Sequence, residues 1–264
     1  MYTSHPSFDL PLDRGSTKVW RYLDFTKFVS LIRERALFFA APRWLGDPFE
    51  GSLTAADIDA RTLAKSKRLY EFAGPVGFEM DGLYGDPDPD INYRRVRLEF
   101  ERAERNRESA LPSIESIGVN CWHLSEAESA AMWSIYVRSR EGVAIQSTVE
   151  RLVRAFNHTS VNVHVGVVRY IDYRDSQVGG DSVFERILTK RASFSFEQEL
   201  RAVCYPITGP GRLVEVDLGE LIERVYVSPQ ARDWFNKLVI GEMTDHGLAA
   251  ELTAGSSLDD RPLF

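Results

Sequence analysis

The sequence predicts an α+β protein with a mixed, largely antiparallel sheet, flanking helices and a helical insertion at residues 55–111. Helical and strand-like patterns alternate irregularly along the 264 residues, and several strand-like stretches follow one another after residue 160. A doubly wound fold would alternate strands and helices regularly. We therefore expect one α+β domain over residues 1–264, within which 55–111 is a helical insertion or subdomain.

The first 51 residues change repeatedly between extended and helical patterns. Apolar residues at every second position predict strands, and apolar residues three and four positions apart predict helices. Asp24 stands where its carboxylate can cap the first helix. The expected elements are an extended arm (1–16), a strand (18–23), a helix (24–36), a second strand (37–42) and a turn-rich loop (43–51).

The insertion differs in composition from the rest of the chain. Residues 56–74 and 91–110 predict helices, and "GDPDPD" at residues 85–90 predicts a loop between them. The second of these helices is densely charged, and such charge runs are typical of solvated helix faces.

After the insertion, residues 117–124 predict a strand. "SEAESAAMWSIYVRSREG" then predicts a single helix, begun by a capping box of Ser125 and Glu128 and ended at Gly142. The elements expected beyond it are a strand (143–148), a helix (149–157), a long β-rich run (161–173), a segment that begins as a helix (181–194), two strands (196–205 and 211–218) and a strand followed by a helix (221–248).

Charge and composition limit the classes of protein to which the chain can belong. The net charge of −7 and the isoelectric point near 5.4 argue against a general nucleic-acid binder, which needs a basic face, but they leave room for a small local basic site. Cys121 and Cys204 lie far apart and outside any metal-type spacing, so we expect them to be buried and reduced.

The amino-terminal residues are polar and contain proline, which does not fit a secretory signal. No stretch approaches the roughly 18 apolar residues of a membrane helix. We therefore expect a cytoplasmic protein with no membrane partner.

No familiar catalytic motif is present. The sequence contains no GxSxG, P-loop or GxGxxG pattern, and its histidines have no metal-type spacing, so we expect no metal site. His123 and His164 fall within predicted strands, where we expect them to be packing residues.

Charged and apolar residues alternate in "SFSFEQELRAV", residues 193–203. If the whole segment is a strand, Glu197, Glu199 and Arg201 share one face. In a cleft, one carboxylate can bind a sugar hydroxyl and the other can position or deprotonate a nucleophile, while Arg201 keeps both ionised. The alternative is a solvated strand face with a Glu199–Arg201 pair, and spacing alone favours it.

The loop "GDPFEG" offers two further carboxylates. Asp47 or Glu50 can face a ligand. Alternatively, Asp47 caps a turn while Phe49 packs into the core, and the residue types alone favour this second interpretation.

Trp133 and Tyr136 lie three positions apart on a predicted helix, where they form either a stacking platform or part of the core. Arg21 lies on or beside the first predicted strand. A lone arginine on a sheet edge is usually a surface residue.

Four blocks of the sequence carry a family resemblance when they are taken in order. They are "RYLDFTKFVSLIRERALFFAAPRWLGDPFEG", "AMWSIYVRSREGVAI", "KRASFSFEQELRAV" and "ERVYVSPQARDWF". These blocks resemble the bacterial family named Domain of Unknown Function twenty-nine seventy-one. The resemblance covers both ends of the chain and skips the insertion. Gly46 stands where the family usually has asparagine, so no role that needs an amide side chain is expected there.

That family has no settled activity. The resemblance implies that its characteristic positions cluster around one pocket. In this chain the positions are Asp47, Pro48, Phe49, Glu50, Trp133, Tyr136, Gly142, Lys190, Glu197, Glu199 and Arg201.

A strand–helix–strand opening with a basic residue on the first strand, followed much later by E-x-E, is similar to ADP-ribosyltransferases. This second resemblance implies that Arg21 anchors NAD and that Glu199 is the main catalytic carboxylate. It also implies that Glu197 faces the acceptor, and that Tyr136 or Trp133 stacks on nicotinamide.

Two functions follow as hypotheses. The first is a nucleotide-directed enzyme, an NAD-dependent ADP-ribosyltransferase or NAD glycohydrolase acting as a toxin or phage-defence effector, with NAD as its substrate. The second is a non-catalytic sensor or partner-binding protein, in which Glu199, Arg201 and Lys190 tie the Asp47 loop to the sheet through charge-assisted hydrogen bonds. The expected ligand is a small nucleotide, and the sequence identifies no protein partner.

Overall fold

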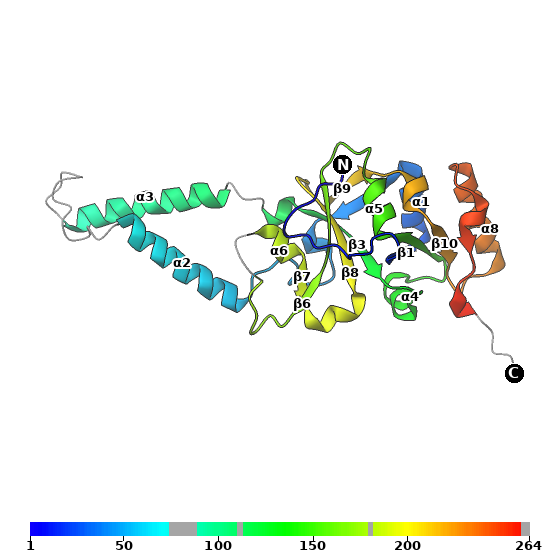
Figure 1. The fold of residues 1–264 in the computed structure, drawn as a ribbon, viewed down its shortest axis with the longest axis horizontal. Coiled ribbons are helices and arrows are strands. Elements are labelled where there is room, and N and C mark those ends of the chain that lie inside the picture. The colour runs from blue at the N-terminus through cyan, green and yellow to red at the C-terminus, as the bar shows by residue number, and fades with distance from the viewer. Residues whose placement is uncertain (74–88, 110–112, 179–181, 260–264) are drawn as a thin grey trace.

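Nine strands build the central sheet of the described residues, and two more form a small parallel ribbon (Figure 1). The computed structural model describes residues 1–73, 89–109, 113–178 and 182–259. The fold is α+β with a mixed, largely antiparallel sheet, as the sequence predicts. The strands are β1 (Lys18–Asp24), β2 (Ala36–Ala40), β3 (Gly118–Leu124), β4 (Gly142–Thr148), β5 (Val163–Val167), β6 (Arg169–Ile171), β7 (Thr189–Arg191), β8 (Glu199–Cys204), β9 (Gly211–Glu215), β10 (Arg224–Val227) and β11 (Thr253–Ala254).

Helices flank the sheet (Figure 1). They are α1 (Phe25–Glu34), α2 (Ala55–Ala73), α3 (Pro89–Ser109), α4 (Ala130–Tyr136), α5 (Val149–Ala155), α6 (Val183–Ile187), α7 (Leu218–Leu221) and α8 (Asp233–Asp245). Two 3₁₀ turns, η1 (Pro42–Trp44) and η3 (Ala192–Glu197), are also important for the site. Among the described helices, none has the length and apolar character needed to cross a bilayer.

Strand β3 is the branch point of the sheet. One of its edges pairs with β8 from Gly118 to His123. On the opposite edge, β1 pairs at His123 and Leu124, whereas β2 pairs at Val119. Within the described part of the chain, residues 120–122 have no strand partner on that edge, so β1 and β2 diverge and the sheet splits there.

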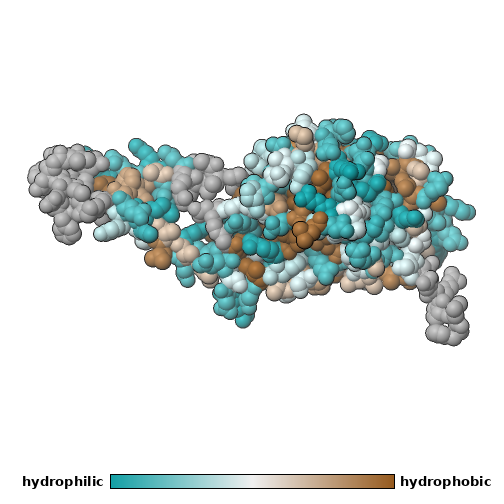
Figure 2. Space-filling model, viewed as in Figure 1, coloured by the Kyte–Doolittle hydropathy of each residue, from teal (hydrophilic) through white to brown (hydrophobic). Residues whose placement is uncertain are grey.

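The main hydrophobic core holds the sheet against α1, α5 and α8. Phe28 and Ile32 of α1, Leu152 of α5, and Phe235 and Val239 of α8 are almost completely buried in it. Burial of each such side chain contributes about 1.5–3 kcal/mol. On the face shown in Figure 2, hydrophilic residues surround a hydrophobic patch near the centre of the body.

Helices α2 and α3 form the predicted helical insertion, and Figure 1 shows them projecting from the body. They contact each other through Phe72 and Phe100, whose ring centroids are 5.7 Å apart, and through a 2.7 Å ion pair between Arg68 and Glu104. Of the loop predicted at 85–90, the last two residues belong to α3 and the others lie outside the described residues.

The strand predicted over residues 196–205 begins later than expected. Ala192–Glu197 is the 3₁₀ turn η3, and Gln198 follows it in the left-handed conformation with φ of 42°. This turn breaks the alternation, so the faces predicted for residues 193–198 are wrong. From Glu199 onward, β8 alternates as the sequence predicts.

The helix predicted after Ser125 is much shorter than expected, and its predicted capping box is wrong. The N-cap of α4 is Ser129, whose Oγ accepts a 3.3 Å hydrogen bond from the backbone N–H of Met132. The Glu128 carboxylate does not return to Ser125. It accepts a 2.7 Å hydrogen bond from the backbone N–H of Ser257 near the carboxyl end of the chain.

Two other local roles also differ from their predictions. Asp24 does not cap α1 with its side chain, because its Oδ1 accepts a 3.1 Å hydrogen bond from the backbone N–H of Arg138. Gly142 does not end a helix but begins β4. A Cβ atom at Gly142 would lie 2.3 Å from a methyl carbon of Val137, so close packing requires glycine there.

Candidate functional site

A cavity of about 1140 Å³ opens where β1 and β2 diverge from each other along one edge of β3. Its volume is slightly larger than the range typical of small-molecule sites, about 300–1,000 Å³. The split sheet, α1, α4, β7, η3, β8 and the loop after η1 all contribute to its wall. The sequence candidates on this wall are Arg21, Asp47, Glu50, Tyr136, Lys190, Glu197, Glu199 and Arg201.

The two carboxylates of the E-x-E pattern face inward. Glu197 and Glu199 are 6% and 4% exposed, and Arg201 is 0% exposed. The solvated strand face that spacing favoured is therefore wrong. Glu197 reaches the cavity from η3 and the other two side chains reach it from β8.

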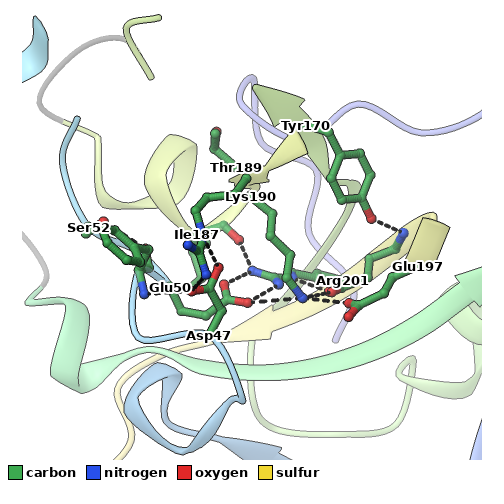
Figure 3. Close-up of polar contacts among 12 residues, drawn as sticks. Asp47, Glu50, Ser52, Tyr170, Ile187, Thr189, Lys190, Glu197 and Arg201 are labelled. Carbon is green, nitrogen blue, oxygen red and sulfur yellow. Dashed lines mark hydrogen bonds and ion pairs between the residues drawn. The ribbon is translucent and has the colours of Figure 1, made fainter. Parts of the chain in front are cut away.

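Lys190 joins the two carboxylates. Its Nζ donates to Glu197 Oε2 at 2.6 Å and to Glu199 Oε1 at 2.7 Å (Figure 3). The second oxygen of Glu199 accepts a 2.6 Å hydrogen bond from Nε of Arg201. Within the described part of the chain, Glu199 thus forms ion pairs with two cations, whereas Glu197 forms one.

Arg201 also fastens the loop after η1 to the sheet. Its Nη1 and Nη2 donate to the two carboxylate oxygens of Glu50 at 2.8 and 2.9 Å, and Nη1 donates to the backbone oxygen of Ile187 at 2.6 Å (Figure 3). Such two-point arginine–carboxylate pairs are among the strongest polar contacts in proteins.

Asp47 forms a second two-point pair in the same loop, with an arginine that sequence analysis missed. Nε and Nη2 of Arg191 lie 3.1 and 2.7 Å from the carboxylate oxygens of Asp47. Asp47 also caps its turn, because Oδ1 accepts a 3.0 Å hydrogen bond from the backbone N–H of Phe49. Phe49 does not enter the core: it is 45% exposed and lies under the guanidinium of Arg191.

The two neighbouring carboxylates have opposite pKa shifts. Burial alone would raise the pKa of Glu199, but the charge of Arg201 and the hydrogen bonds to the carboxylate hold that pKa well below its usual range. For Glu197, burial and then a hydrogen bond to Glu199 raise the pKa to about 7. The pair therefore keeps one charge on Glu199 and places a titratable proton on Glu197 near neutral pH.

We predict that the contribution of Glu197 to the stability of the protein falls as the pH rises from about 4.5 to about 7. Over this window the folded protein keeps the Glu197 proton, whereas the unfolded chain, with a pKa near 4.5, has lost it. Glu199 works in the opposite direction, and its contribution is lost only at lower pH. Melting curves recorded across this pH window give the slope of the free energy of unfolding against pH. The slopes of wild type and Glu197→Gln should differ by the amount expected for about one bound proton. Equal pH slopes would contradict the assignment.

Arg21 lies in the split of the sheet. Its predicted position on a sheet edge suggested a surface residue, so that expectation is wrong. Its Nη1 donates to Cys121 O at 2.5 Å and to Asn120 Oδ1 at 3.1 Å, so it uses polar groups of the β3 residues that have no strand partner there. Nε is buried without a hydrogen-bond partner, and among the described residues no carboxylate forms an ion pair with Arg21. Its positive charge is thus uncompensated, unlike the charges of Lys190 and Arg201.

Tyr136 and Trp133 lie in different environments in the structure. Tyr136 lies on the cavity wall, 40% exposed, and burial followed by the nearby charge of Glu197 raises the pKa of its hydroxyl. Trp133 is 6% exposed and packs edge-on against Tyr22, with ring centroids 5.1 Å apart. Its predicted place beside a ligand is therefore wrong, because it belongs to the packing between α4 and β1.

Strand β3 supplies wall residues that sequence analysis treated as packing or as inert thiols. Cys121, a free and partly buried thiol, pairs across the strands with Arg201, and His123 pairs with Glu199. The one sequence pattern that could have identified them as wall residues is their alternate spacing in "NCWHL", which puts both on one face of the strand.

An apolar shelf borders the charged part of the cavity. Phe38 and Leu213, which pair across β2 and β9, are each 46% exposed, and Trp44 of η1 is 65% exposed. Asn120 links this shelf to Arg21, because its Nδ2 donates to Phe38 O at 2.9 Å while its Oδ1 accepts from the guanidinium.

No group of three or more His, Cys, Asp or Glu side chains within the described ranges has the geometry of a metal site. The site therefore consists of a fixed ion-pair network, a titratable Glu197, an uncompensated Arg21 and an apolar shelf around one cavity. Comparison of the chain with protein-family models, curated proteins and solved structures found no match to any of them.

Proposed function

We propose that the protein is a nucleotide-directed enzyme that breaks the bond between ribose and nicotinamide in NAD, as an NAD glycohydrolase or an ADP-ribosyltransferase. One observation carries the proposal: the uncompensated guanidinium of Arg21 and the Glu197–Glu199 pair face the same cavity. The resemblance of the E-x-E pattern and of the opening strand to ADP-ribosyltransferases points the same way.

The cavity wall complements a nucleotide in two respects. A guanidinium with no carboxylate partner attracts an anion, and its fork of donors suits phosphate oxygens. Exposed aromatic rings such as Phe38 and Trp44 offer a stacking surface for a base, worth about 1–3 kcal/mol per base. Asn120 joins the two features, so both can contact one ligand.

The acidic pair supports a division of roles in the reaction. As nicotinamide leaves with the electron pair of the glycosidic bond, positive charge develops on the ribose, and the fixed negative charge of Glu199 stabilises it. Water or an acceptor group then forms the new bond to the ribose carbon and gives its proton to the carboxylate of Glu197. Lys190 and Arg201 keep Glu199 ionised throughout.

Release of nicotinamide from NAD by the purified protein tests this function. We expect turnover with NAD alone for a glycohydrolase, and turnover that depends on an added acceptor for a transferase. As a toxin or phage-defence effector, the protein should also deplete NAD in the cells that express it. Failure to release nicotinamide under both conditions would reject the proposal.

Substitution of Arg21 by glutamine should weaken NAD binding by about 10–100-fold, because hydrogen bonds to a charged group contribute about 1.5–3 kcal/mol each. Glutamine can still donate to Cys121 O, so the split sheet keeps one of its contacts. Isothermal titration with NAD measures the change. Arg174→Gln, at an exposed position, is the matched control and should bind as wild type does. Equal affinity of the two variants would contradict the role of Arg21.

A non-catalytic sensor or partner-binding protein is the second candidate. It is favoured by the two arginine–carboxylate pairs, Arg201 with Glu50 and Arg191 with Asp47, which tie the loop after η1 to the sheet as that hypothesis requires. If this second function is correct, the folded protein binds a nucleotide but does not release nicotinamide from NAD. The turnover experiment therefore separates the two functions.

A further inference from the structure

His123 has a defined tautomer. Its Nδ1 lies 2.6 Å from the backbone oxygen of Glu197. A carbonyl oxygen can only accept, so Nδ1 carries the proton in this contact. In the neutral ring, Nε2 then has the lone pair and is an acceptor.

The acceptor nitrogen faces open space. His123 is 8% exposed and belongs to the cavity wall. Within the residues that the structure describes, Nε2 makes no hydrogen bond, and it is not one of the sealed, unpaired nitrogens. Since the cavity is the space beside this side chain, Nε2 is available to a ligand there.

The surroundings of Nε2 determine which ligand group fits. His123 lies directly opposite Glu199 in the pairing of β3 with β8. Its Nδ1 donates a hydrogen bond to the backbone oxygen of Glu197, which provides the second carboxylate. Lys190, one nearby donor, is already used by Glu197 and Glu199. The Tyr136 hydroxyl on the same wall can either donate or accept. This end of the cavity therefore presents several acceptors, which complement a hydroxyl group because a hydroxyl can donate to them.

We propose that Nε2 of His123 accepts a hydrogen bond from a ribose hydroxyl of the substrate and so positions the sugar beside Glu199. This inference rests on the proposed function, because it assigns the donor group to a nucleotide. An imidazole nitrogen accepts from a hydroxyl there without adding a negative charge beside Glu199.

Two substitutions separate the structural contact from the ligand contact. In His123→Asn the amide nitrogen takes the place of Nδ1 and can still donate to Glu197 O, but no atom takes the place of Nε2. In His123→Gln the amide oxygen takes the place of Nε2, and the Nδ1 contact is lost. We expect His123→Asn to raise KM for NAD about 3–10-fold with little change in melting temperature. His123→Gln should melt lower and retain more of the affinity. An unchanged KM in His123→Asn would overturn the inference.

Chemical modification provides a test that does not need turnover. Diethylpyrocarbonate acylates accessible, unprotonated imidazole nitrogens, and mass spectrometry identifies the modified residue. We expect His123 to react in the native protein and to be protected by saturating NAD or ADP-ribose, while the exposed His158 reacts equally with and without ligand.

The outcomes distinguish the two proposals. Protection of His123 without nicotinamide release would reject the enzymatic function and leave the ribose contact in place. Nicotinamide release with an unreactive or unprotected His123 would reject the ribose contact and leave the function in place. If NAD releases no nicotinamide and neither NAD nor ADP-ribose protects His123, both proposals fail.

Discussion

Substitution of Arg201 by methionine is expected to lower the free energy of unfolding by about 3–5 kcal/mol, the usual cost of breaking a buried ion pair from one side. Arg201 is completely buried and is the main partner of both Glu199 and Glu50. Methionine fills much of the same volume but donates no hydrogen bond. Among the described residues, the cation that remains near Glu50 is then the Lys190 ammonium, 3.4 Å away, which also contacts Glu197 and Glu199.

Urea denaturation of three variants checks this expectation. Arg224→Met, at an exposed strand position, is the matched control and should stay within about 0.5 kcal/mol of wild type. Arg201→Lys keeps the charge but loses the two-point contact with Glu50, so its loss should be intermediate. A loss below about 1 kcal/mol in Arg201→Met would mean that Glu50 and Glu199 do not depend on the guanidinium.

Substitution of Glu197 by glutamine is expected to slow nicotinamide release about 100–10,000-fold, the range typical of a lost general base. Glutamine has the shape and the neutral charge of protonated Glu197, and its oxygen can still accept from Lys190, so the fold should persist. The same role predicts that release by wild type rises as the pH passes through about 7, because Glu197 accepts a proton only in its ionised form.

Glu34→Gln, at an exposed position on α1, is the control for this variant and should turn over NAD as wild type does. Circular dichroism establishes whether Glu197→Gln remains folded. A folded Glu197→Gln protein with near-normal release would show that another group takes the proton.

The sequence predicted the fold class and most elements because periodicity is a local property of the chain. Predictions failed where a contact distant in sequence decides the local structure. Glu128 is an acceptable partner for Ser125 in a capping box, but it binds Ser257 in the structure. Gln198 adopts a left-handed conformation that residue type alone does not require, and this displaces the start of β8.

The candidate site was predicted in part. Spacing found Glu197, Glu199 and Arg201 but favoured solvent for them, because alternate charges on a strand carry no information about what lies above the strand. Arg201 is buried in contact with Glu50, a residue 151 positions away along the chain. Likewise, Arg191 and His123 gain their roles only from the pairing of β3 with β8 and from the loop after η1.

The split of β3 has a consequence for how this scaffold can diversify. At residues 120–122 the sheet gives up main-chain pairing on one edge, and side chains supply the missing contacts. Substitutions at these few positions can therefore alter which ligand the cavity binds, while the outer strands keep their register. A family built on this framework can acquire new ligands by exchanging residues at the gap, without redesigning the architecture around it.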